Sequence, residues 1–155
     1  MVYHDAAIRS LIERVGVANV RDLCQQPGMQ AVYRITVYAV SGRIRHSIAT
    51  LLVSAQRHKL EVVYDGLFEH QPLQYSINIA EYDAFVTTLR KARFDVLHDQ
   101  ANLLLSSDSI WQIERAAGSL HHQVILAPSK PEKPYSLLVN AIDAYLPQAI
   151  REITY

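Results

Sequence analysis

The sequence predicts an α+β fold, with an antiparallel sheet of about five or six strands and helices packed on one face. Several short segments alternate apolar and polar residues, as half-buried strands do, and turn residues separate neighbouring segments. Other segments carry apolar residues at helical spacing. Because a sheet must bury at least one face, we expect the amphipathic helices to cover it.

The composition is that of a folded protein. Half of the 155 residues are hydrophobic and 19% are charged, which excludes an intrinsically disordered chain. A chain of this length buries roughly 68–70% of its extended surface, so its core needs neither disulfides nor metal. Cys24 is the single cysteine and has no partner for an internal disulfide. Without a long apolar run or a signal-peptide pattern, we expect a soluble, cytoplasmic protein with a single domain, 1–155.

Residues 1–28 are expected to form a small helical cap. An apolar stripe at the spacing of one helix face is formed by Ile8, Leu11, Ile12 and Val15. Asp5 is the expected N-cap of this helix, and Gly16 follows its last turn. A second, short helix is expected after the N-cap Asn19, and it must end before Pro27 and Gly28.

These two helices, with a glycine between them, resemble a helix-hairpin-helix motif, which binds DNA phosphates through exposed backbone N–H groups. That motif needs two glycines, and Ala18 stands where the second would be. The net charge of zero at pH 7 also gives the chain no attraction to nucleic acid or to a membrane surface. We therefore expect no membrane and no nucleic acid as partner.

Residues 31–78 are expected to form a β-meander. Alternation or continuous apolar character predicts strands over 33–38, 44–53, 60–64 and 73–77. The breaks between them contain typical turn residues, such as Ser41-Gly42 and Asp65-Gly66.

The remaining elements follow in order along the chain. A capping pair, Asn78 and Glu81, precedes an amphipathic helix within 79–97. Residues 102–109 are expected to form a loop, and 110–127 a β-hairpin. The proline-rich segment 128–134 is an exposed connector. The C-terminal helix, 134–147, ends at Pro147.

The charges are unevenly distributed along the chain. No Asp or Glu lies between Cys24 and Leu60, where the basic residues are Arg34, Arg43, Arg45, Arg57 and Lys59. The segment from Glu61 to Leu89 has acidic residues and no Lys or Arg. One interpretation is a basic binding face, with these five residues along one sheet edge. The other is that neighbouring strands pair and neutralise each other's charges.

The C-terminal hairpin contains a candidate acid–base pair. With a turn centred between Ala117 and Gly118, Glu114 lies directly opposite His121, close enough for a hydrogen bond. Trp111 then lies on the other, apolar face. The pair would serve as a general acid and base, or it is an ordinary cross-strand contact. Because no pattern in the sequence marks a nucleophile, we favour the ordinary contact.

No metal or cofactor is expected. The adjacent His121 and His122 cannot converge on one ion, because successive strand residues point to opposite faces. The sequence also has no glycine-rich phosphate loop of the Gly-x-Gly-x-x-Gly or Walker type.

One further pattern runs from about Tyr33 to Leu146. It consists of Tyr33-Arg34, Asp65-Gly66, a helix over 80–94, Trp111-Gln112-Ile113-Glu114, Gly118, His121 and Pro128. The order resembles an uncharacterised bacterial protein family with a Trp-x-x-Glu…Gly…His…Pro hairpin pattern. It departs from that family at Ser107-Asp108-Ser109, where Leu-Asp-Gly usually precedes the Trp. The resemblance implies no activity, but it groups Trp111, Glu114 and His121 as one unit.

Two classes of function follow from these features. The first is a non-catalytic module that binds another protein, such as an immunity-type or adaptor protein, through the basic residues and Trp111. The second is a small hydrolase or lyase that uses Glu114 and His121. A pocket bordered by both residues and a third polar group would favour the enzyme, and a convex face would favour the binding module.

Overall fold

The computed structural model describes residues 2–101, 103, 108–129 and 131–155. Its strands are β1 (Met29–Ala39), β2 (Ser47–Ser54), β3 (His58–Tyr64), β4 (Leu73–Ser76), β5 (Ser109–Ala117) and β6 (Leu120–Leu126). Its α-helices are α1 (Val2–Val15), α2 (Val20–Cys24), α3 (Ile79–Lys91) and α4 (Tyr135–Tyr145). Short 3₁₀ helices are η1 (Phe68–His70), η2 (Phe94–Val96) and η3 (Pro147–Ile150).

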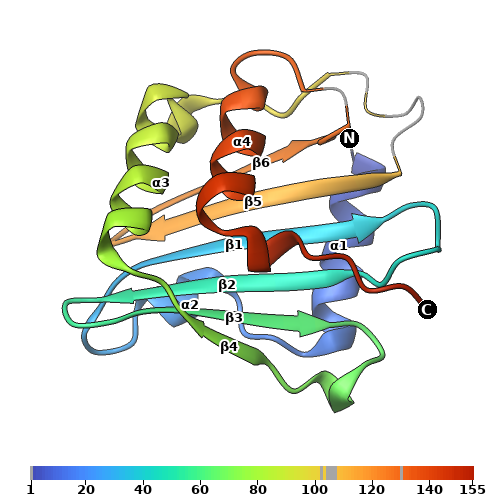
Figure 1. Cartoon of the computed structure of the whole chain (residues 1–155), viewed down its shortest axis with the longest axis horizontal. Helices are drawn as coiled ribbons and strands as arrows, with labels where there is room; N and C mark the ends of the chain where they lie inside the picture. Colours follow the sequence, from blue (N-terminus) through green and yellow to red (C-terminus); the bar gives the residue numbers. More distant parts are fainter. Residues whose placement is uncertain (1, 102, 104–107, 130) are drawn as a thin grey trace.

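The strands form one six-stranded antiparallel sheet in the order β4-β3-β2-β1-β5-β6, seen in Figure 1. The first four strands are the predicted meander. The β5–β6 hairpin joins the free side of β1, so β1 lies inside the sheet with a partner on each side. The predicted α+β class is therefore confirmed.

One face of the sheet packs against α3, α4 and η3, which lie in front of it in Figure 1. The buried cluster on this face contains the residues predicted to share it: Ile35, Val62, Ile77, Trp111 and Val124. Phe85 of α3 and Leu138 of α4 complete the cluster and are fully buried. This part of the core follows from the period-two pattern of the strands.

The opposite face of the sheet is covered by α1 and α2. Ile8 of α1 packs against Ile110 and Ile125, which alternate along β5 and β6 with residues of the first face. Val20 and Cys24 of α2 belong to a separate cluster with Val32 and Ala116. The prediction that all helices pack on one face is therefore wrong for the N-terminal helix. Because the strands carry apolar residues on both faces, each face needs a cover.

The helix ends agree with the sequence at two of three predicted caps. The side chains of Asn19 and Asn78 accept hydrogen bonds from the backbone N–H groups of Asp22 and Glu81, as N-caps do. The helix α1 begins before Asp5, so Asp5 is no cap and forms an i,i+4 ion pair with Arg9 instead. The predicted loop 102–109 falls mainly outside the described residues. Within those residues, no helix has the length and hydrophobicity that crossing a membrane requires.

Candidate functional site

A continuous row of polar side chains crosses the sheet on the α1 and α2 face. Direct cross-strand pairing places these residues side by side, from β4 to β6: Gln74, Glu61, Thr50, Arg34, Glu114 and Gln123. The next positions toward α2 include the apolar Val32 and Ala116, and those toward α1 include Ile125. We call this set the polar row. It lies between the areas that the two helices cover.

A cavity of about 600 Å³ opens over the β1–β5–β6 part of the polar row. Arg34, Glu114 and Gln123 of the row line it, together with Gln112 of β5. The other wall comes from α1 and from the connection to α2, with Asp5, Arg9, Ile12, Glu13, Gly16, Val17 and Asn19. Its volume lies in the range of cavities that bind small molecules, and eight of its eleven lining residues are polar or charged.

Arg34 is the central charged group of this cavity and is 2% exposed. Its Nε donates a hydrogen bond to Thr50 Oγ1 at 3.0 Å. Burial lowers the pKa of Arg34, and the negative charge of Glu114 opposes that effect. Among the described residues, its two terminal amino groups have no acceptor and no ion-pair partner. The cavity therefore contains a buried cation with free donors.

Glu114 and His121 form the predicted pair. His121 Nε2 lies 3.1 Å from Glu114 Oε2, and Glu114 is 8% exposed. They are diagonal neighbours, because Glu114 lies opposite Gln123 and His121 opposite Ala116. The prediction that Glu114 lies directly opposite His121 was therefore wrong by two residues in the register of the hairpin. A shift of two residues keeps every side chain on its face, so the pair still lies on the face opposite Trp111.

Two further polar groups near the cavity lack partners. Gln112 is 4% exposed, lines the cavity, and makes no side-chain hydrogen bond within the described ranges. Thr36, directly opposite Gln112 on β1, has a buried hydroxyl with no partner among those residues. A buried hydroxyl is rarely left unpaired in native proteins, so that of Thr36 calls for an explanation, whereas Gln112 lines the cavity. Both lie beside Arg34 or Glu114 on the same face of the sheet.

The basic residues predicted to gather at one sheet edge do not do so. Arg34 is buried on the interior strand β1, and Lys59 on β3 lies 3.5 Å from Glu61. Arg43 and Arg45 follow β1, whereas Arg57 lies in the turn after β2, at its other end. Because β2 runs back along the whole of β1, residues close in sequence are separated by the length of a strand.

Arg45 contributes to the fold rather than to an open surface. Its Nη1 donates to the backbone carbonyl groups of Asp65 and Gly66, and its guanidinium lies 4.5 Å from the ring centre of Tyr155. Arg43 is exposed and lies 3.6 Å from Asp108. The chain therefore presents no convergent patch formed by these five residues.

Trp111 lies in the core on the α3 and α4 face and is 6% exposed. It lines a separate hollow of about 290 Å³ with Val37 and Ile150. The sheet separates it from Glu114 and His121. The structure therefore does not bring these three residues together as one unit.

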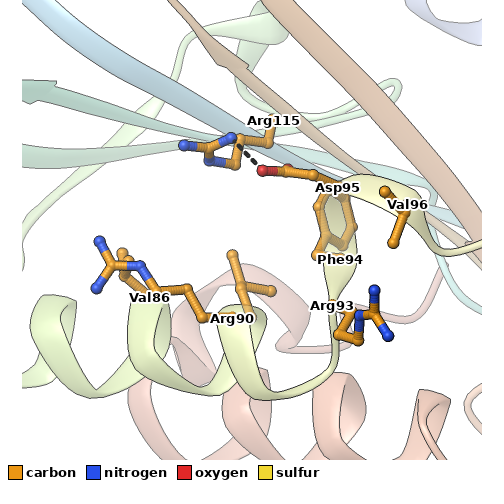
Figure 2. A pocket seen from close by; sticks show the side chains of 8 residues that line it. Val86, Arg90, Arg93, Phe94, Asp95, Val96 and Arg115 are labelled. Atoms are coloured by element: carbon orange, nitrogen blue, oxygen red, sulfur yellow. Dashed lines mark hydrogen bonds and ion pairs between the residues drawn. The ribbon is translucent and has the colours of Figure 1, made fainter.

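A third hollow, of about 320 Å³, lies at the end of α3 and is drawn in Figure 2. Arg115 reaches Asp95 at 2.8 Å, which neutralises its charge. Figure 2 shows the side chains of Arg90 and Arg93 pointing in different directions, away from this pair. Since its cations do not converge, this hollow is a weaker candidate than the cavity beside Arg34.

The sequence pattern predicted Arg34, Glu114 and His121 as candidate residues, but not Gln112 and Gln123. A signal for Gln112 was present, because the alternation Trp-Gln-Ile-Glu puts the polar Gln112 and Glu114 on one face and the apolar Trp111 and Ile113 on the other. In the part of the chain that the structure describes, no three His, Cys, Asp or Glu side chains form a metal-binding group. Comparisons with protein-family models and with curated proteins gave no match to this chain. The resemblance noted in the sequence therefore stays a prediction.

Proposed function

We propose that this protein binds a small organic molecule with a carboxylate group in the cavity between α1 and the sheet. The observation that carries the proposal is Arg34, which is buried in the cavity with two amino groups that lack acceptors. A guanidinium group binds carboxylates through two parallel hydrogen bonds, and such charge-assisted bonds are strong. The unpaired amide of Gln112 offers a further contact to the ligand.

The size of the cavity and the burial of Arg34 support a small molecule as the ligand. About 600 Å³ is enough for a metabolite and is too small for a folded partner. Arg34 is only 2% exposed at the base of this cavity, so the flat surface of a folded partner has little access to its guanidinium group. The free donors of Arg34 and Gln112 are available to a molecule that enters the cavity.

The test is a titration of the full chain with a panel of small carboxylates at pH 7.5, by isothermal calorimetry and by thermal unfolding. A ligand at about 100 times its dissociation constant should stabilise the protein by about 2.7 kcal/mol. The Arg34→Met variant should lose binding and keep its fold, because Met fills similar volume without a buried charge.

The matched control is Arg57→Met, at an exposed arginine in the turn between β2 and β3. It should bind as the wild-type protein does. Equal binding by Arg34→Met and by the wild-type protein would disprove the proposal, and so would the absence of binding across the panel.

A second candidate function is acid–base chemistry on the bound molecule. The hydrogen bond between His121 and Glu114, at 3.1 Å beside the cavity, favours it. Glu114 would take a proton from a C–H group next to the ligand's carboxylate, and His121 would hold the carboxylate of Glu114 in place.

Hydrogen exchange tests this second candidate without knowledge of the product. In D₂O, a general base removes the C–H proton and returns a deuteron, so the bound compound gains one mass unit per exchanged proton. We expect exchange with the wild-type protein and a rate reduced by about 10²-fold or more in Glu114→Gln. The same exchange rate in both proteins would contradict this role for Glu114.

Binding of another protein, the first class that the sequence favours, stays a prediction, as does a cytoplasmic location. Charge reversal at the exposed Arg43 tests protein binding directly. Arg45 is unsuited to the test, because its contacts with Asp65, Gly66 and Tyr155 make a loss of stability the expected result.

A further inference from the structure

The floor of the cavity holds two opposite charges that do not pair. Arg34 and Glu114 lie directly opposite each other on β1 and β5. Cross-strand neighbours have Cβ atoms about 4.5–5.5 Å apart, close enough for an ion pair. Arg34 instead turns to Thr50 on β2, and Glu114 turns to His121 on β6, so no ion pair joins the two within the described residues.

A simple anion could pair with Arg34, but it would leave the negative charge of Glu114 without a cationic partner from the ligand. Asp5 is already occupied by Arg9 at 2.7 Å and by the amide of Gln123 at 3.3 Å. Apart from Asp5 and Arg9, the charged residues that line the cavity are one cation, Arg34, and two anions, Glu114 and the exposed Glu13. An anion on Arg34 would meet the negative charge of Glu114 on the neighbouring strand. A ligand that also carries a cation would satisfy both groups.

We propose that the ligand is a small zwitterion of the α-amino-acid class, whose carboxylate binds Arg34 and whose ammonium group binds Glu114. This inference rests on the proposed function and specifies its ligand. In an α-amino acid the two charged groups are attached to one carbon atom, which suits two side chains at directly opposed positions of adjacent strands. Gln112 adds an amide that donates and accepts, and Ile12 and Val17 supply apolar wall for the side chain.

Ligands that lack one of the two charged groups measure how much each group contributes to binding. We would titrate the full chain at pH 7.5 with L-alanine, L-valine and L-glutamine, then with the carboxylates that lack the amino group and with the amines that lack the carboxylate. At least one amino acid should bind about tenfold or more tightly than both of its matched analogues.

Two variants test which residue binds the carboxylate of the ligand and which binds its ammonium group. Glu114→Gln keeps a group that can hydrogen-bond His121, and it should weaken amino-acid binding about tenfold or more while leaving carboxylate binding unchanged or stronger. Arg34→Met should remove binding of both ligand types. Circular dichroism and thermal unfolding of each variant show whether the fold is kept.

The outcomes distinguish this inference from the proposed carboxylate site on which it rests. If carboxylates bind as tightly as amino acids, and Glu114→Gln does not weaken amino-acid binding, the zwitterion inference fails and the carboxylate site stands. If no amino acid and no carboxylate binds, both fail. Tighter binding of the amines than of the amino acids also overturns the inference, because the carboxylate would then weaken binding instead of pairing with Arg34.

Discussion

His46 shows how burial controls the charge of a single side chain. Its Nδ1 accepts a hydrogen bond from the backbone N–H of Ala39 at 2.9 Å, and its ring stacks on Tyr38 with 4.5 Å between ring centres. Burial lowers the pKa of His46, the negative charge of Asp65 partly opposes this, and the charge of Arg14 adds to the lowering. The folded protein therefore holds this imidazole neutral more strongly than the unfolded chain does.

Stability should fall as the pH is lowered through about 6.5, the ordinary pKa of histidine. Because the folded-state pKa of His46 is the lower one, the unfolded chain binds the proton more tightly, and the stabilisation present above about pH 6.5 is lost below it. Urea unfolding at pH 7.5 and 5.5 measures this change. His46→Gln should show a smaller difference between the two pH values than the wild-type protein.

The exposed His98 provides the control for this comparison. His98→Gln should keep the pH dependence of the wild-type protein, because His46 is intact. The same pH dependence in His46→Gln and His98→Gln would contradict the assignment.

At the scale of elements, α3 depends on its N-cap. Asn78 Oδ1 accepts from the backbone N–H of Glu81 at 2.8 Å, and Asn78 Nδ2 donates to Glu81 Oε1 at 2.7 Å. Asn78→Ala should therefore lower the free energy of unfolding by about 1 kcal/mol. The control is Asn140→Ala, at an exposed position inside α4, where alanine is the better helix former and no loss is expected. Equal losses in both variants would argue against a capping role.

The β5–β6 hairpin depends on the backbone of Gly118. Ala117 pairs with Leu120, so Gly118 and Ser119 form the turn, and Gly118 has a φ of 58°. Apart from Gly118 itself and its two neighbours in the chain, no atom of the described residues lies within 4 Å of the position that a Cβ would take, so the cost of a side chain comes from the backbone conformation. Gly118→Ala should cost about 1–2 kcal/mol of unfolding free energy. Gly118→Asn should cost less, because Asn tolerates this conformation better, and the reverse order would show that another effect dominates.

At the scale of the whole molecule, two helical layers stabilise one sheet from opposite faces. Leu11 of α1 and Leu138 of α4 are both fully buried. Each substitution to Ala should cost about 2–5 kcal/mol of unfolding free energy. Because the sheet separates the two sites, the losses should add in the double variant to within about 0.5 kcal/mol. Only Leu11→Ala should also weaken ligand binding, since α1 forms a wall of the cavity.

Urea unfolding of the two single variants and the double variant measures this additivity. A single transition with additive losses is the expected result. If Leu11→Ala leaves the free energy of unfolding unchanged, the helix α1 does not belong to the cooperative unit.

The sequence by itself determined the local elements and the face of each strand residue. Period-two and helical patterns report which side of an element is apolar, and the caps at Asn19 and Asn78 are local signals. For the same reason the Glu114–His121 pair was predictable despite the wrong turn position, because an error of two residues leaves every side chain on its face.

Only the tertiary structure decided which distant strands pair and which face α1 covers. The pairing of β1 with β5 brings Arg34 opposite Glu114, 80 positions later in the chain, and no local pattern encodes that register. The basic residues looked like one group in the sequence, but the antiparallel return of β2 separates them. The cavity exists because α1 and α2 cover apolar residues on either side of the polar row, and that arrangement depends on packing across the whole sheet.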